Sequence, residues 1–420
     1  MTPPRVLYIG SYPIGHPNAT GQTLMSLYGN SDPERLTQWV YRSSEAPTLG
    51  EVIAIPAHVA PIGMALRAPY LALQRLRSRA PAPGDGLNDS IRRTGLSMRE
   101  RVFRDLRVAA DLAPVRLPGA TVRAISARRP QVIHTLLGNG RMLRLAIATS
   151  RTLDIPIVPH FMDDWISTLY TSGELGGRAR RLVESLCEEV LARSPVAMGI
   201  GTLMAEEYRQ TLGRPVAVVG NAVDLSSFAQ PGGTAPPETN RLVYVGGLHL
   251  GRGRVITDLA QRISSSGVRI RVHSPEGPHP AAAALPGGEL VDWADSLSTD
   301  QVPSVLRSSS ALLFVESSED SIAAYTRLSV STKVPQYIAS GRRIVVVGPA
   351  GQGSVYELEN AARGRVLRVS LDNFDLLALQ GFFEGSPSSL ADTAHLDYTT
   401  DVMQERLFTT LEGAVTAWRG

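Results

Sequence analysis

The sequence of 420 residues predicts an α/β protein with two doubly wound parallel sheets. Short runs of apolar and β-branched residues alternate with longer stretches of helical pattern, and this alternation continues through both halves of the chain. Most of the runs are apolar without interruption, which is typical of parallel strands whose two faces are both covered. The helical stretches between them suit βαβ crossovers.

The first strand is expected at VLYIG, residues 6–10, which ends in a glycine turn. Seven later runs have the same form and are also expected to be strands: 131–138, 155–165, 215–224, 241–247, 268–274, 311–317 and 342–349. The segment AQPGGTAPPETN, residues 229–240, is rich in Pro, Gly and Thr, so it is the expected domain boundary. We therefore expect an N-terminal domain over residues 1–228, a C-terminal domain over 229–400, and an amphipathic helix at 401–420.

Charge and composition argue against several classes of protein. The formal net charge of +3 is too small to indicate a nucleic-acid-binding protein. No segment approaches the roughly 18 uninterrupted apolar residues of a membrane span, and the N-terminus lacks the pattern of a signal peptide. Cys187 is the only cysteine, which fits a reducing compartment, and the histidines show no metal-binding spacing. We expect a cytoplasmic protein without a metal site.

One region departs from this balance of charge. Between Arg67 and Arg129 the chain has 14 arginines and five acidic residues. Such a local field can attract an anionic acceptor, or bring the protein to the inner face of an anionic membrane as a peripheral contact. The alternative is a solvated, arginine-rich helical insertion.

Lys333 is the only lysine of the sequence, and the other 41 basic residues are arginines. Ser331 and Thr332 can cap a helix that begins near Lys333, and Gly341 can end it before the next strand. The start of a helix presents N–H groups and a partial positive charge, so with a lysine beside it this is a candidate anion site. The alternative is a capped helix with an exposed lysine.

The run that begins at Lys333, Lys-x-x-x-Tyr-Ile-Ala-Ser-Gly-Arg followed by a strand, resembles the donor motif of family 4 glycosyltransferases. Four other segments are similar to family landmarks in the same order along the chain: 8–29, 155–170, 218–228 and 241–253. The resemblance implies the GT-B fold, in which two Rossmann-like domains face a cleft and the last helix packs back on the N-terminal domain. It also implies retaining, hexosyltransferase-type transfer from a nucleotide-diphosphate sugar, with no cofactor or required metal. The acceptor, a polysaccharide, a lipid-linked glycan or a small molecule, would lie on the N-terminal domain.

The resemblance assigns the donor to eight residues: Lys333, Arg252, Ser331, Thr332, Gln336, Gly246, Gly247 and Gly21. Lys333, Arg252 and the backbone amides of 331–333 would neutralise the diphosphate. Gln336 stands at the second position of the family's glutamate pair, and Leu328 stands at the first. The carboxylate that contacts the sugar is therefore unassigned, with Glu316 as one candidate. The glycines are equally well explained by tight turns, and the loop before Gly21 by an ordinary crossover.

Three residues are candidates for the catalytic pocket: His160, Asp163 and Asp164. Asp163 aligns with an aspartate of the family, but Met162 stands where many members have a histidine. Either aspartate can bind acceptor hydroxyls or stabilise developing positive charge; alternatively, either can cap the following helix. Because the glutamate pair and the pocket histidine are missing, a catalytically silent binding or scaffold subunit is an alternative. A sugar-nucleotide epimerase of the same fold is a weaker one.

Overall fold

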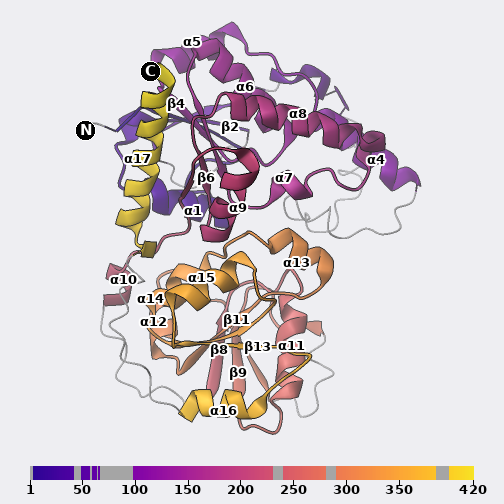
Figure 1. Cartoon of the computed structure of the whole chain (residues 1–420), viewed down its shortest axis with the longest axis vertical. Coiled ribbons are helices and arrows are strands. Elements are labelled where there is room, and N and C mark those ends of the chain that lie inside the picture. Colours follow the sequence, from indigo (N-terminus) through magenta and orange to yellow (C-terminus); the bar gives the residue numbers. More distant parts are fainter. Residues whose placement is uncertain are drawn as a thin grey trace. The chain divides into compact units, whose positions relative to one another are not determined.

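The computed structural model describes residues 3–41, 49–56, 59–63, 65–66, 98–229, 240–280, 290–384 and 397–420. The chain forms two compact units (Figure 1). Unit 1 comprises Met1–Gly220 with Gln404–Gly420, and unit 2 comprises Asn221–Met403. Residues 67–97 of the arginine-rich region and 230–239 of the expected domain boundary lie outside the described residues.

Unit 1 is built on a seven-stranded parallel sheet in the order β3-β2-β1-β4-β5-β6-β7. The strands are β1 (Val6–Gly10), β2 (Leu36–Val40), β3 (Glu51–Ala54), β4 (Val132–Thr135), β5 (Ile157–Phe161), β6 (Ala197–Gly199) and β7 (Val216–Val218). Val6 of β1 lies opposite Leu36 on one side and Val132 on the other. The order of strands therefore reverses between β1 and β4.

Helices pack around this sheet, and two of them begin at an asparagine that caps the first turn. They are α1 (Ala19–Tyr28), α4 (Met98–Asp111), α5 (Gly119–Ala127), α6 (Gly140–Leu153), α7 (Trp165–Thr168), α8 (Arg178–Ala192), α9 (Thr202–Leu212) and α17 (Thr400–Arg419). Asn18 caps α1 and Asn139 caps α6, each accepting a bond from a backbone amide of the first turn. Most of α17, drawn in yellow in Figure 1, belongs to unit 1, where Trp418 Nε1 donates to the Asp154 carbonyl at 3.2 Å.

Unit 2 is built on a six-stranded parallel sheet in the order β10-β9-β8-β11-β12-β13. The strands are β8 (Arg241–Val245), β9 (Arg269–His273), β10 (Val291–Ala294), β11 (Ala311–Val315), β12 (Arg343–Val347) and β13 (Val366–Val369). The helices are α10 (Ser226–Ala229), α11 (Arg252–Arg262), α12 (Val302–Ser308), α13 (Asp320–Thr326), α14 (Lys333–Ala339), α15 (Gly353–Ala361) and α16 (Leu376–Glu384).

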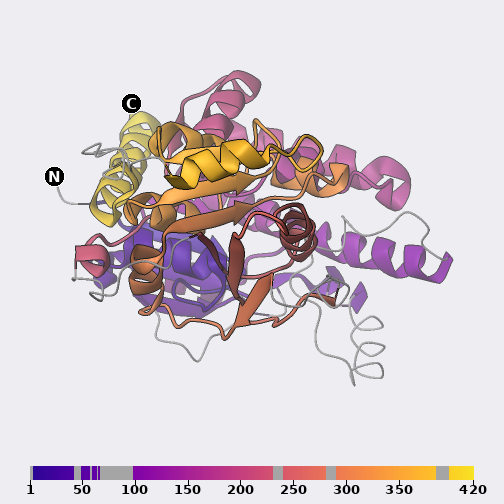
Figure 2. The ribbon, with the colours of Figure 1, turned by 90° about the horizontal axis from the view of Figure 1, so that it is seen from below.

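Two apolar clusters cover the two faces of this second sheet. Leu313 of β11 packs with residues of α11 and α16 on one face (Figure 2). Its neighbours Leu312 and Phe314 pack with residues of α12, α14 and α15 on the other face. Because successive side chains of a strand point to opposite faces, an unbroken apolar run is what such a strand requires. The predicted fold class, two doubly wound parallel sheets, is confirmed.

All eight predicted strands are present, but five others are missed. β3, β10 and β13 are four-residue strands at the edges of their sheets, with mostly half-buried residues, and β6 has three residues. β2 is fully buried yet contains Gln38, whose side chain accepts a bond from Ile14 N and donates one to the Leu49 carbonyl. A glutamine with such partners can occupy a core, but its sequence signature is that of a polar surface.

Candidate functional site

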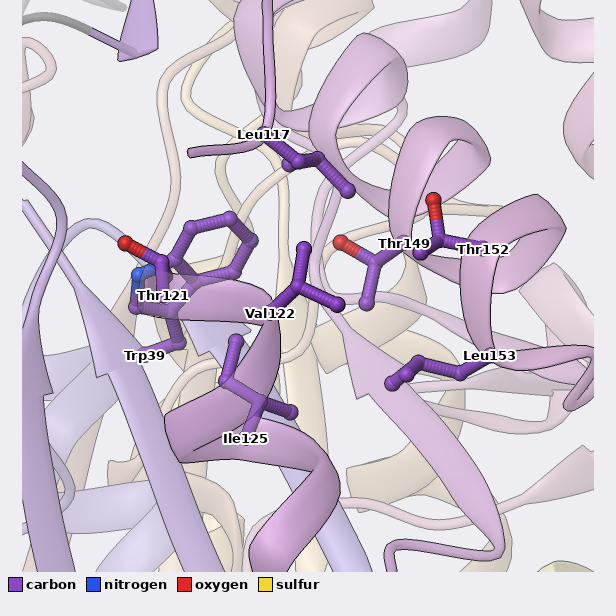
Figure 3. Close-up of a pocket in the computed structure, with 8 residues that line it drawn as sticks. All are labelled: Trp39, Leu117, Thr121, Val122, Ile125, Thr149, Thr152 and Leu153. Carbon is purple, nitrogen blue, oxygen red and sulfur yellow. The ribbon is translucent and has the colours of Figure 1, made fainter. Parts of the chain in front are cut away.

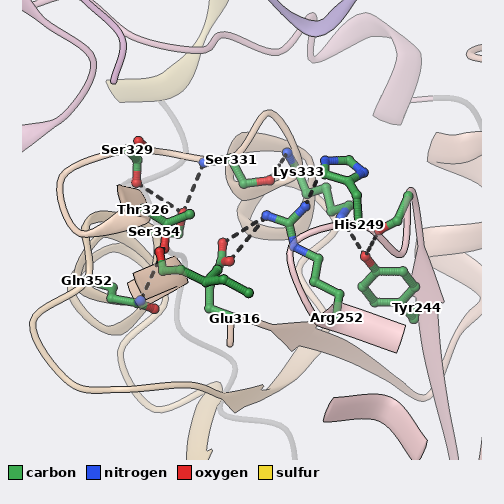
Figure 4. A network of polar contacts seen from close by, with 12 residues as sticks. Tyr244, His249, Arg252, Glu316, Thr326, Ser329, Ser331, Lys333, Gln352 and Ser354 are labelled. Carbon is green, nitrogen blue, oxygen red and sulfur yellow. Dashed lines mark hydrogen bonds and ion pairs between the residues drawn. The ribbon is translucent and has the colours of Figure 1, made fainter. Parts of the chain in front are cut away.

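The candidate site lies in unit 2, where the strand order reverses between β8 and β11. In open α/β sheets this switch point leaves a crevice at the carboxyl ends of the strands, which is where ligands bind. Gly246 and Gly247 follow β8, and Glu316 follows β11. Arg252 begins α11 and Lys333 begins α14, and the side chains of Arg252, Glu316 and Lys333 come together there (Figure 4).

The side chain of Lys333 is held by Tyr244 and by a glycine. Its Nζ lies 4.5 Å from the centroid of the Tyr244 ring and donates a hydrogen bond to the hydroxyl at 2.9 Å. That hydroxyl donates in turn to the carbonyl of Gly247 at 2.6 Å. Gly246 has a φ of +133°, and a Cβ built there would lie 2.2 Å from Lys333 Cε. This φ favours glycine, and any larger residue would also have to displace the lysine side chain that crosses over the backbone.

Arg252 forms a buried ion pair with Glu316. Its Nη2 donates to both carboxylate oxygens of Glu316 at 3.2 Å, and the two residues are 8% and 3% exposed. Its Nη1 lies 3.5 Å from His249 Nε2. The resemblance assigned Arg252 to the donor phosphates, but its Nη2 is already bound to a carboxylate inside the protein, whereas its buried Nε has no hydrogen-bond partner among the described residues. Arg252 therefore contributes a fixed positive charge beside Lys333 rather than a free phosphate ligand.

The ammonium of Lys333 has an unusual electrostatic setting. Burial, followed by the neighbouring Arg252 guanidinium, lowers the pKa of Lys333 from 10.5 to about 7, although Glu316 and Glu276 act in the opposite direction. Among the residues that the structure describes, Lys333 forms no ion pair. At neutral pH this amine is therefore poised between its charged and neutral forms.

The loop before α14 is tied to α15 by a network of hydroxyl groups (Figure 4). Ser331 N donates to Ser354 Oγ at 3.0 Å, and Ser354 Oγ donates to the Ser329 carbonyl at 3.3 Å. The amide of Lys333 makes a long bond of 3.4 Å to Ser331 Oγ. Two of the three backbone amides assigned to an anion thus already have partners. Thr332 is the N-cap residue but makes no side-chain cap bond.

The remaining residues assigned to the donor do not all gather at this site. Gln336 lies half-buried within α14, and Leu328, at the other glutamate position, is a core residue that is 1% exposed. A Cβ on Gly247 would lie 2.7 Å from His249 Nδ1, so a side chain here would require that histidine to move. Gly21 lies in unit 1, where a Cβ would lie 2.1 Å from the carbonyl oxygen of His16. The backbone that lies close to Gly21 is therefore that of the preceding loop, at His16.

Tyr244, whose ring and hydroxyl contact the Lys333 amine, was not predicted as a site residue from the sequence. Its only sequence signature is an aromatic residue two positions before a glycine pair, inside an apolar strand, and such a residue is ordinarily part of the core. Glu316 was one of several candidate carboxylates. In the structure it forms an ion pair with Arg252.

The two candidate aspartates of unit 1 have different surroundings. Asp164 is 2% exposed and accepts bonds from the hydroxyls of Tyr208, at 2.6 Å, and Ser167. It precedes α7 as the N-cap residue without a side-chain bond to the helix backbone. Asp164 therefore anchors α7 to α9, whereas Asp163 is half-buried.

His160 belongs to a buried chain of hydrogen bonds and not to an open pocket. Its Nε2 donates to the Val219 carbonyl at 2.7 Å, because a carbonyl can only accept. Its Nδ1 must then accept from His134 Nε2 at 3.2 Å, and His134 Nδ1 accepts from the Tyr28 hydroxyl at 2.8 Å. Burial lowers the pKa of His160 to about 4, and that of His134 well below its usual value. Both rings are neutral core residues, and we assign His160 no part in the chemistry.

A cavity in unit 1 offers no alternative ligand site. It is enclosed by apolar and threonine side chains of β2, α5 and α6, among them Trp39, Val122 and Thr149 (Figure 3). Its volume of about 10 Å³ is at the lower limit for a single water molecule.

Comparison with known proteins identifies the fold. No family model matches the chain, and no curated protein matches its sequence. A glycosyltransferase from Rickettsia africae ESF-5 superposes with a TM-score of 0.57 at 7% identity, over 98% of this chain and 99% of that one. HepE of Anabaena, in complex with UDP, gives 0.56 at 10%, over 97% and 100%. A putative UDP-N-acetylglucosamine 2-epimerase from Listeria monocytogenes gives 0.51 at 12%, over 99% and 97%. The chain therefore has the GT-B fold, with two Rossmann-like domains.

Proposed function

We propose that the protein is a glycosyltransferase that takes its sugar from a nucleotide-diphosphate donor bound in unit 2. The observation that carries the proposal is the Lys333 amine, held beside the buried Arg252 guanidinium over a glycine turn at the switch point of the sheet. Two positive groups with only one carboxylate partner between them favour a polyanionic ligand. The shared fold with a glycosyltransferase and with a structure in complex with UDP supports the same class of donor.

The roles of the residues follow from their surroundings. Lys333 would bind the diphosphate directly, and Arg252 would strengthen the local positive field from its buried position. Both would stabilise the negative charge that grows on the leaving diphosphate as the glycosidic bond to it breaks. In unit 1, Asp163 would bind an acceptor hydroxyl. Retention of configuration, hexosyl specificity and independence from a cofactor are proposals that rest on the sequence resemblance.

A lysine substitution tests this assignment. We expect Lys333→Ala to lower transfer by roughly 10²-fold, the size of loss typical when one charge-stabilising donor is removed. Arg254→Ala is the matched control, because Arg254 lies two residues beyond Arg252 with a side chain that is 80% exposed. The measurement is a screen of nucleotide sugars by thermal shift, followed by donor turnover with candidate acceptors. Wild-type turnover by folded Lys333→Ala would contradict the phosphate assignment.

The same screen separates the alternatives. Donor binding without turnover with any acceptor would favour a catalytically silent binding subunit. This alternative is tested because Leu328 and Gln336 replace the glutamates of the family's pair. Conversion of the donor sugar without an acceptor would favour an epimerase, which the shared fold with the Listeria protein makes worth testing.

Contact with a membrane surface is a further part of the proposal. Among the described residues, no helix is long and apolar enough to cross a bilayer. Helix α4 exposes Met98 by 77% and Val102 by 51%, next to the exposed Arg101. Exposed apolar side chains beside arginine suit the interface of an anionic membrane. Flotation with anionic liposomes should show salt-sensitive binding that Met98→Ser together with Val102→Ser weakens; no binding at low salt would contradict it.

A further inference from the structure

The amine of Lys333 has a positive neighbour and, among the described residues, no carboxylate as an ion-pair partner. Both oxygens of Glu316 bond to the guanidinium of Arg252, which leaves that carboxylate occupied. The hydrogen bond that Nζ makes is to the uncharged hydroxyl of Tyr244. A half-buried ammonium in this arrangement is stabilised by a ring face and a hydroxyl, and Glu316 and Glu276 favour it without forming an ion pair with it.

The carboxylates of Glu316 and Glu276 oppose the lowering of the Lys333 pKa without cancelling it, and the ring of His249 is the other titratable group coupled to the amine. Strand β8 contributes Tyr244, helix α11 contributes Arg252, and the end of β11 contributes Glu316. Glu276, after β9, lies 3.8 Å from His249 Nδ1 and accepts a bond from Ser274 Oγ at 2.6 Å, so it faces partners other than the lysine. On α14 itself, the hydroxyl of Tyr337 donates to the Leu313 carbonyl.

We propose that Lys333 is a proton-coupled anion ligand: its amine, positioned by Tyr244, takes up a proton from solvent when a diphosphate binds. The lone pair of Nζ accepts the proton, and the resulting ammonium pairs with a phosphate oxygen. The inference rests on the proposed function, because it takes the diphosphate of a nucleotide sugar as the ligand. Tyr244 acts through Lys333 and is a positioning residue.

The pKa of Lys333 sets the direction and the size of the coupling. The pKa of about 7 means that the amine is largely neutral at pH 8 while the site is empty. An adjacent diphosphate favours the charged form and raises the pKa of the amine. Binding at pH 8 should therefore take up about 0.9 proton per ligand, and affinity should fall about tenfold per pH unit above 7. Below pH 7 the amine is already charged, so Lys333 adds no pH dependence there.

The absence of any other lysine makes the central measurement direct. Protein labelled with carbon-13 at the lysine Cε gives one lysine resonance, that of Lys333. We expect it to titrate near pH 7 in the free protein and about two to three pH units higher with saturating UDP, which is the rise that an uptake of about 0.9 proton at pH 8 requires. Titration near 10.5 in the free protein would overturn the proposal, whatever the enzyme does.

Two probes keep this inference separable from the proposed function. If UDP fails to move the resonance but inorganic pyrophosphate moves it upward, proton coupling stands and the nucleotide donor assignment fails. If neither probe moves it, proton coupling is overturned. Calorimetry of UDP binding at pH 8, in two buffers of different ionisation enthalpy, should give about 0.9 proton taken up. A value near zero would count against the proposal.

The positioning role of Tyr244 has its own test. Tyr244→Phe keeps the ring but removes the hydroxyl that accepts the Nζ bond, so we expect about tenfold weaker UDP binding at pH 7 and a changed Lys333 titration midpoint. The matched control is Tyr337→Phe, which removes a buried hydroxyl whose bonds are to the backbone of Leu313 and Val245. If Tyr244→Phe leaves both readouts unchanged, or if Tyr337→Phe moves them equally, Tyr244 is not the positioning residue.

Discussion

Acidification should destabilise unit 1 through its buried histidine pair. In the folded protein His160 and His134 are fully buried, and their hydrogen-bond chain requires both rings to be neutral. In the unfolded chain the same rings are in water and titrate normally. Because burial lowers the pKa of each ring, the unfolded state binds more protons as the pH falls below 6.5. Stability is therefore unaffected by this pair above that pH and decreases below it.

The size of the effect follows from the pKa of His160. The difference between an ordinary value of 6.5 and the folded value of about 4 corresponds to about 3 kcal/mol once the pH is below both. At pH 5, where only the unfolded form is charged, His160 alone should lower the free energy of unfolding by about 2 kcal/mol. His134 acts in the same direction, so this figure is a lower bound for the pair.

Urea unfolding at pH 7.5, 6.0 and 5.0 measures this loss. Trp39, Trp165 and Trp418 lie in unit 1, so a Trp293→Phe background confines tryptophan fluorescence to that unit. His160→Gln in this background keeps a donor for Val219 and an acceptor for His134 but cannot titrate in this range. It should lose much of the acid sensitivity, whereas the control His273→Gln, in unit 2, should retain it. An equal free energy of unfolding at pH 7.5 and 5.0, or an unchanged pH dependence in His160→Gln, would refute the reasoning.

Two further predictions concern the proposed donor and acceptor sites. Gly246→Ala should weaken UDP binding about tenfold or more, because the new Cβ displaces Lys333. Gly341→Ala is the control for backbone strain alone, because Gly341 has a φ of +69° and open space around it. An equal loss of affinity in both variants would contradict a specific clash with Lys333. Asp164→Ala should lower stability by about 1–3 kcal/mol by leaving the Tyr208 hydroxyl without its partner. Asp163→Asn keeps the size of the side chain and removes its charge, so it should lower transfer more than Asp164→Ala does relative to its effect on stability. The reverse pattern, from urea unfolding and donor turnover, would exchange the two roles.

The fold could be predicted from the sequence because buried parallel strands appear in it as continuous runs of apolar residues. A strand such as β11 packs on both faces, so each of its residues must be apolar, and the run stands out from its surroundings. The strands that were not predicted are those in which some residues are exposed or polar, so that the run is not apolar throughout. β3 lies at an edge and is half-exposed, while β2 buries polar side chains that find partners in loops remote in sequence. Those partners exist only after folding.

The candidate site shows the same division between local and non-local information. Lys333 could be found because a helix start, a lysine and a glycine-terminated strand succeed one another along the chain. Its ring partner Tyr244 lies 89 residues away, and the carboxylate of Arg252 lies 64 residues away. Pairings at that separation depend on strand order, which periodicity does not specify. For the same reason the sequence treated Arg252 as a free phosphate ligand, when in the fold it already has a carboxylate.

The use of lysine at position 333, in a chain that otherwise uses arginine, is consistent with this geometry. A guanidinium stays charged at every relevant pH, so an arginine here would place a second permanent positive charge beside Arg252 whenever the site is empty. The methylene groups of Lys333 pass close over the backbone of Gly246, and an arginine at position 333 would have to place its wider, planar guanidinium in the same space. A lysine amine can give up its proton in the empty site and regain it when an anion arrives. The buried Arg252–Glu316 pair can then remain intact through each cycle of binding and release, because the change in charge occurs on Lys333.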